Sequence, residues 1–169
     1  MLGVLLYYGR AVDSTILVAL SSISSAQATP TTQTIKLTNI LLDYAATHPD
    51  AILTYKKSNM VLAVHSDASY LSKTGARSRT GGHFFMSLDV ENPPKNGAII
   101  NTSNIIKSVM SSAAKAELAG LYINASQAVS IQQLPHKMGH TQQQTPIQID
   151  NSTVLGDVTN NIHHDAPNQ

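Results

Sequence analysis

The stretch "MVLAVHSDASY", residues 60–70, decides the fold, because its apolar run predicts a buried strand that ends on an acid, Asp67. A carboxylate that enters a protein core is costly unless a partner compensates its charge, and a metal ion is one such partner. The chain has only ten acidic residues. The position of Asp67 is therefore the first indication of a functional site.

Two other acids repeat the pattern of Asp67. Glu117 lies in the alanine-rich segment 111–129, which predicts a helix with serines available as N-caps. Its neighbours one and two turns away are alanines and a leucine, so Glu117 is expected to face the sheet. Asp150 closes the short apolar strand predicted over 146–150. Each acid thus occupies a place where packing alone favours an apolar residue.

Each of these acids also has a simpler explanation. Asp67 could cap the loop after its strand, and Asp150 could cap a following helix. Glu117 could pair with an arginine such as Arg79. Taken together, the order of a strand-end Asp, a helical Glu and a second strand-end Asp favours convergence on a divalent metal.

The composition limits the class of protein. With 169 residues the chain has room for one ordinary domain, or for one domain and part of another. Charged residues make up 12% of the chain, about half the roughly 25% usual for soluble domains. A net charge of +1 excludes a strong global field. Between residues 56 and 79, however, Asp67 is the one acid among five basic residues, so this region is either a solvated loop or a phosphate-facing one.

The N-terminus and the absence of cysteine bear on location. No cysteine is present, which excludes disulfides and thiolate metal sites and fits a reducing compartment. The run Ala26-Gln27-Ala28 imitates a signal-peptidase site, but the start lacks a basic residue, and Arg10 and Asp13 interrupt the apolar run. An intracellular protein, cytoplasmic or nuclear and not secreted, is therefore expected, with a secreted one as the weaker alternative. No apolar stretch is long enough for a membrane span.

The remaining pattern predicts the order of elements. The sheet should contain three antiparallel strands, with the strand 146–150 added parallel to strand 60–67 and the helix 111–129 as the crossover. The segment 132–145 reads as a polar loop, and 72–82 reads as a basic loop. The other predicted elements are helices over 11–27 and from about 32 to 48, and strands over 51–55, 83–88 and 98–110, the last with a hairpin through 101–104 as an alternative.

Four runs in this order carry a family resemblance: "HSDASY", "RSRTGGHFF", "VMSSAAKAELAGLY" and "PIQIDNSTVLG". They resemble "YSDADW", "RSTSGYVF", "SSTEAEYIAL" and "DNQGA" in the ribonuclease H domain of copia-type LTR retrotransposon Pol polyproteins. The N-terminal part, from "GVLLYYGRAVDSTILVALSS" to "DYAATHPDAILTY", is similar to the thumb-to-connection tail of the preceding reverse transcriptase. The set of runs, rather than any single one, carries the resemblance.

The resemblance implies an α/β (α+β) fold, a ribonuclease H-like mixed sheet with a crossover helix. It implies a mostly helical reverse-transcriptase remnant over 1–57 and an incomplete ribonuclease H-like domain over 58–160. The last residues, 161–169, have almost nothing to bury and predict a disordered tail. The family continues past its third acid through a basic segment with a fourth carboxylate, a last strand and a helix. Asp157 and Asp165 do not match that segment. The chain is therefore expected to be C-terminally truncated.

The resemblance also implies the chemistry. Asp67, Glu117 and Asp150 would be the catalytic, metal-binding carboxylates, with two Mg²⁺ ions about 3.5–4 Å apart, or Mn²⁺ as a substitute. The reaction would be hydrolysis of the RNA strand of an RNA–DNA hybrid, impaired by the truncation. Ser69, Arg77 and Arg79 would lie near the substrate backbone.

Two alternatives accompany this implied activity. The chain could be a non-catalytic nucleic-acid-binding remnant that uses the basic loop. It could also self-associate through a sheet edge left exposed by the missing strand.

Overall fold

The computed structural model describes residues 2–73, 75–88, 91–151 and 156. The predicted tail 161–169, Asp157 and Asp165 lie outside the described residues. The elements, in chain order, are α1 (Leu2–Ala11), the 3-10 helix η1 (Ser14–Ile16), α2 (Leu17–Ser25), α3 (Thr32–Thr47), β1 (Val61–Lys73), β2 (Arg77–Ser87), β3 (Ala98–Ile105), α4 (Ala113–Lys137) and β4 (Ile147–Gln148).

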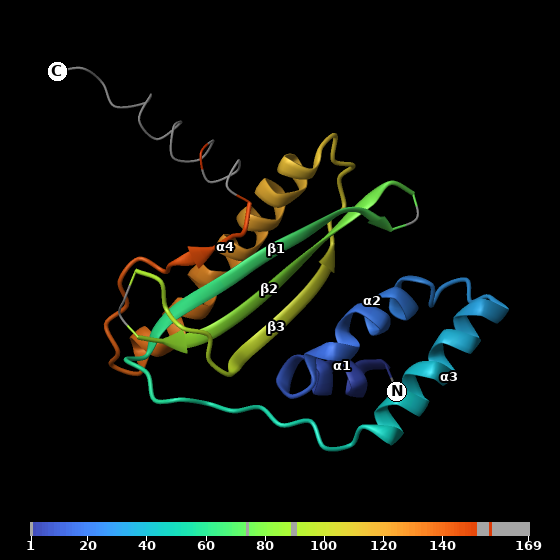
Figure 1. The fold of residues 1–169 in the computed structure, drawn as a ribbon, viewed down its shortest axis with the longest axis horizontal. Coiled ribbons are helices and arrows are strands. Elements are labelled where there is room, and N and C mark those ends of the chain that lie inside the picture. The colour runs from blue at the N-terminus through green and yellow to red at the C-terminus, as the bar shows by residue number, and fades with distance from the viewer. Residues whose placement is uncertain (1, 74, 89–90, 152–155, 157–169) are drawn as a thin grey trace.

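The centre of the fold is a four-stranded mixed sheet in the order β3-β2-β1-β4. β1 and β2 pair antiparallel, as do β2 and β3, whereas β4 pairs parallel to β1 through Val64 and Ile147. The helix α4 connects β3 to β4 and packs against β1 and β2 (Figure 1). The α+β class, the parallel addition of β4 and the crossover helix are therefore confirmed.

Two separate apolar cores hold the fold together. One lies between α4 and the sheet and is built from Leu62, Val64, Phe84 and Ala128. The other lies among the N-terminal helices and is built from Ile16, Leu20, Ile23 and Leu41. Figure 1 shows α1, α2 and α3 gathered beside β3, away from α4, and both α1 and α2 contact β3.

The alternation of side chains along β1 and β2 decides which of them face α4. Asn124 of α4 is fully buried and donates hydrogen bonds of 2.8 Å to Ser66 Oγ and to the Gly81 carbonyl oxygen. Ser66 thus points toward α4, and the next residue along β1, Asp67, points to the other face. By the same alternation Arg79 faces away from α4, because Thr80 lies against Gly120 of that helix.

The basic loop predicted over 72–82 is wrong in its extent. β1 continues to Lys73 and β2 begins at Arg77, so most of this segment is a β-hairpin. A register shift follows Ser69, and Leu71 adopts a φ of 51° while its N–H donates to Ser78 Oγ. The hairpin closes through Gly75 and Ala76, both with positive φ. Pairing with β2 orders a segment that composition alone predicted to be a loop.

Four other element predictions need correction. Residues 51–55 form no strand, and the Asn96 side chain bonds both backbone groups of the following Lys56. The helix predicted to end at 129 runs to Lys137, with Pro135 inside its last turns, and ends before Gly139 at φ 92°. The predicted strand 146–150 pairs over only two residues. The segment 98–105 is one strand, not a hairpin.

The two edge strands of the described sheet bear on the predicted self-association. The outer strand β4 has two residues, and β3 at the opposite edge contacts α1 and α2. Association through an edge therefore stays a prediction.

None of the helices in the described ranges combines the length and hydropathy that crossing a bilayer requires.

Candidate metal centre

The three acids singled out from the sequence converge in the fold. Asp67 lies on β1, Glu117 lies in the first turns of α4, and Asp150 follows β4 by two residues. Each offers one carboxylate oxygen, and these oxygens lie within 4.8 Å of one another. The cause is the parallel pairing of β1 and β4, because parallel strands run toward the same end of the sheet. The crossover helix α4 begins beside that end.

Glu117 is the buried member of this acid cluster. It is 8% exposed, whereas Asp67 and Asp150 are exposed, so the cluster is open to solvent on one side. Burial raises the pKa of the Glu117 carboxyl, and the negative charges of Asp67 and Asp150 raise it further. A hydrogen bond from the backbone of Ala68 opposes this rise. The cluster therefore disfavours three simultaneous negative charges unless a cation is present.

The donor set fits a hard divalent cation. Glu117 Oε2 is buried and has no hydrogen-bond partner, although buried carboxylate oxygens are normally satisfied. Carboxylate oxygens are the ligands that Mg²⁺ and Mn²⁺ prefer. The three acids could therefore hold a metal ion, with Glu117 Oε2 available as a ligand.

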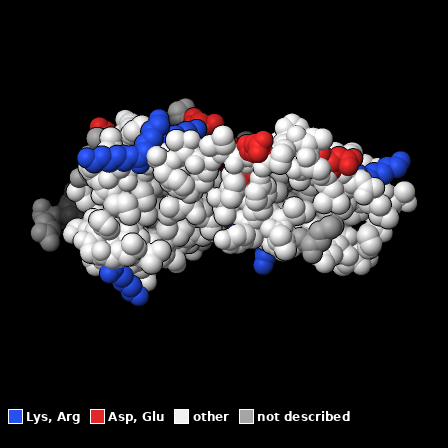
Figure 2. Space-filling view, turned by 90° about the horizontal axis from the view of Figure 1, so that it is seen from below, with Lys and Arg blue, Asp and Glu red and all other residues white. Residues whose placement is uncertain are grey.

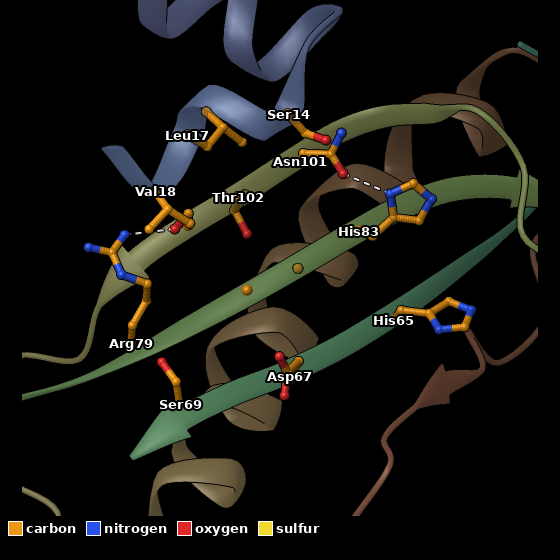
Figure 3. A pocket seen from close by; sticks show the side chains of 13 residues that line it. Ser14, Leu17, Val18, His65, Asp67, Ser69, Arg79, His83, Asn101 and Thr102 are labelled. Carbon is orange, nitrogen blue, oxygen red and sulfur yellow. Dashed lines mark hydrogen bonds between the residues drawn. The ribbon is translucent and has the colours of Figure 1, made fainter. Parts of the chain in front are cut away.

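Of the three residues expected near the substrate, two line one cavity and the third does not. Ser69 and Arg79 are partners across β1 and β2, and both line a cavity of roughly 370 Å³ that also reaches Asp67 (Figure 3). Arg77 is exposed at the start of β2 and does not line this cavity. Arg79 donates from Nη1 to Ser103 Oγ, so the alternative in which it pairs with Glu117 is not realised.

Sequence reasoning missed two histidines on the same face. His65 and His83 lie side by side across β1 and β2, with ring centroids 6.3 Å apart, and both line the cavity. Burial lowers the pKa of His65, and electrostatic repulsion from Lys95 and from His83 lowers it further. The sequence carried a signal for His65, because positions 65, 67 and 69 of a strand lie on the same face as one another.

The face of the molecule drawn in Figure 2 shows how its charged side chains are distributed. In Figure 2 the basic and acidic side chains stand in small groups separated by uncharged surface. Binding of a polyanion to this face would thus depend on individual contacts rather than on a broad basic stripe.

Comparison of the chain with protein-family models, with curated proteins and with solved structures finds no match in any of the three.

The raised pKa of Glu117 predicts an unusual pH dependence for the metal-free protein. The folded state keeps a proton on Glu117 that the unfolded chain releases near the ordinary value of 4.5. Between this value and the raised pKa the folded state binds more protons, so its free energy of unfolding falls as pH rises. Denaturant unfolding in a chelator, at pH values from below 4.5 to above neutrality, measures this fall.

Glu117→Gln should remove this fall in the free energy of unfolding. A divalent metal should reduce the fall in the wild-type protein, because metal binding displaces the proton from Glu117. An equally steep fall in Glu117→Gln would assign it to other groups.

Proposed function

We propose that this chain is a ribonuclease H-like hydrolase fragment, derived from a copia-type retrotransposon Pol polyprotein, that acts on the RNA strand of RNA–DNA hybrids. The observation that carries the proposal is the meeting of Asp67, Glu117 and Asp150 within 4.8 Å at one edge of the sheet. The strand order and the α4 crossover support the ribonuclease H-like assignment. The four sequence runs support the family.

Each acid has a distinct role in this proposal. Asp67, in the central strand β1, and Asp150, after β4, present exposed carboxylates to the metal and substrate. Glu117 approaches from α4 and is oriented by the backbone of Ala68. When bound, divalent ions would activate a water and stabilise the leaving oxygen of the phosphodiester.

The proposed activity is weak. Among the described residues the cluster contains three acids and no fourth one joins it. Three carboxylates hold one ion well, but they leave a second ion mainly to water and substrate phosphate. Hydrolysis that needs both ions is therefore expected to be slow.

A cleavage assay tests the proposal directly. With a labelled RNA–DNA hybrid, slow release of RNA fragments is expected in Mg²⁺ or Mn²⁺, and none in a chelator. Asp67→Asn should abolish the release, because it removes a metal-binding charge from the central strand. The matched control is Asp43→Asn, which removes one exposed acid from α3, outside the cluster. Cleavage that survives Asp67→Asn would contradict the proposal.

The second candidate is a nucleic-acid-binding remnant without catalysis, favoured by the buried Arg79 on the sheet face. It predicts hybrid binding that neither needs metal nor changes in Asp67→Asn. Binding of this kind, with no cleavage by wild type in either metal, would favour the second candidate over the first.

A further inference from the structure

A second cavity adjoins the acid cluster on the side of β4. It measures roughly 470 Å³, and both Asp67 and Asp150 line it. Asn92 and Lys95, from the connection between β2 and β3, line it as well. Figure 1 shows this connection close to β4. A ligand in this cavity would therefore contact the acid cluster and the connection together.

Asp67 lies where this cavity meets the one beside α2. His65 and Asp67 line both cavities, and Figure 3 shows the two side chains along β1. The two cavities thus adjoin each other at these residues. A nucleic-acid strand that reaches Asp67 has Lys95 within the lining of the space next to it.

The backbone on both sides of Lys95 is tied to the rest of the fold. The Pro94 carbonyl oxygen accepts a hydrogen bond of 3.1 Å from Ser87 Oγ. The Asn96 side chain accepts from the N–H of Lys56 at 2.7 Å and donates to its carbonyl oxygen at 3.0 Å. A ligand that binds Lys95 therefore has to order only its side chain, because the backbone is already held.

The Lys95 ammonium is available to a ligand. Lys95 is exposed, and its side chain makes no hydrogen bond or ion pair with any residue that the structure describes. Glu91, four residues earlier, lines a different cavity. Burial lowers the pKa of His65, and repulsion from Lys95 lowers it further, so the ammonium lies near the His65 wall of the cavity.

A counter-ion role is the alternative for Lys95. An ammonium near Asp67 and Asp150 could offset the negative charge of the metal-free cluster. However, no ion pair joins Lys95 to either acid, and the two acids still raise the pKa of Glu117. The charge of Lys95 is therefore better explained by an anion that enters the cavity from solvent.

We propose that Lys95 binds a phosphate of the nucleic-acid strand whose phosphodiester lies at the metal centre, and that it holds this strand on the β4 side of Asp67. The inference rests on the proposed function and names a further binding residue for it. Lysine binds phosphate as a point charge, so the contact fixes the position of the strand without reading its bases.

The test compares three variants of the whole chain. Lys95→Met keeps the aliphatic stem and removes the charge, whereas Lys95→Arg keeps the charge. The matched control, Lys36→Met, removes an exposed lysine from α3, which does not line the cavity. Binding of labelled RNA–DNA hybrids of two unrelated sequences is measured in a chelator at several salt concentrations. KM and kcat for cleavage are measured in Mg²⁺, and melts with and without Mg²⁺ report on the metal centre.

Lys95→Met is expected to weaken hybrid binding about tenfold at about 0.1 M salt and to reduce the salt slope by about 1, equally for both sequences. KM should rise by a similar factor, with a smaller change in kcat, because the contact is present before and during the reaction. Lys95→Arg should restore most of the binding, and Lys36→Met should match wild type. Each variant should keep its thermal stabilisation by Mg²⁺, which shows that it folds.

Three outcomes overturn the inference. If Lys95→Met binds and cleaves hybrids as Lys36→Met does, the strand does not reach Lys95, and the proposed function stands as long as wild type cleaves. If Lys95→Met only loses stability in the chelator and binds Mg²⁺ more tightly, Lys95 is a counter-ion of the acid cluster. If wild type neither binds nor cleaves hybrids, the inference fails together with the proposed function.

Discussion

Asp150→Asn is expected to raise the stability of the metal-free protein and, in the same variant, to remove most of its stabilisation by Mg²⁺. The reason is that Asp150 adds a negative charge beside Glu117 and Asp67 and raises the pKa of the buried Glu117. Removing this charge relieves the repulsion in the metal-free state. It also removes one of three oxygen donors, so the affinity for Mg²⁺ should fall at least tenfold.

Thermal melts in a chelator and in Mg²⁺ measure both effects. A ligand that binds only the folded state, at 100 times its dissociation constant, stabilises it by about 2.7 kcal/mol. Wild type should approach this gain and Asp150→Asn should gain little, while Asp43→Asn on α3 should match wild type. A wild-type protein that gains nothing from millimolar Mg²⁺ would remove the basis for the metal centre.

The acid cluster could be predicted because each acid violates a local pattern. Asp67 and Asp150 end apolar strands, and Glu117 interrupts the apolar stripe of a helix. Such violations are visible in the residues themselves. The parallel pair could be predicted because a long helix lies between the two strands, and parallel neighbours need such a connection. The structure agrees on each of these points.

The parts that could not be predicted depend on contacts between distant segments. The hairpin of β1 and β2 overrides a turn-rich composition because its strands pair along most of their length. The burial of Arg79 follows from the packing of α2 and β3 around it, which no local pattern encodes. The helix α4 continues past Val129 because residues such as Ile131 pack on the sheet core.

Phe84→Ala is expected to have the largest effect on stability. Phe84 is fully buried between β2 and α4, in the core with Leu62, Val64 and Ala128. Removing a buried phenyl ring costs about 3–5 kcal/mol, a large part of the 5–15 kcal/mol typical of a whole protein. Because this core holds α4, and with it Glu117, against β1, the variant should also lose its response to Mg²⁺.

Leu20→Ala provides the matched comparison in the other core. Leu20 is equally buried, but it packs with Ile16, Ile23 and Leu41 among the N-terminal helices. Its loss should cost about 2–5 kcal/mol and loosen α2 and α3, measured as faster proteolysis there, while Mg²⁺ still stabilises the sheet. This difference tests the predicted division between 1–57 and 58–160. If both variants melt in one transition and both lose the Mg²⁺ response, the helices and the sheet fold as one unit and the division is wrong.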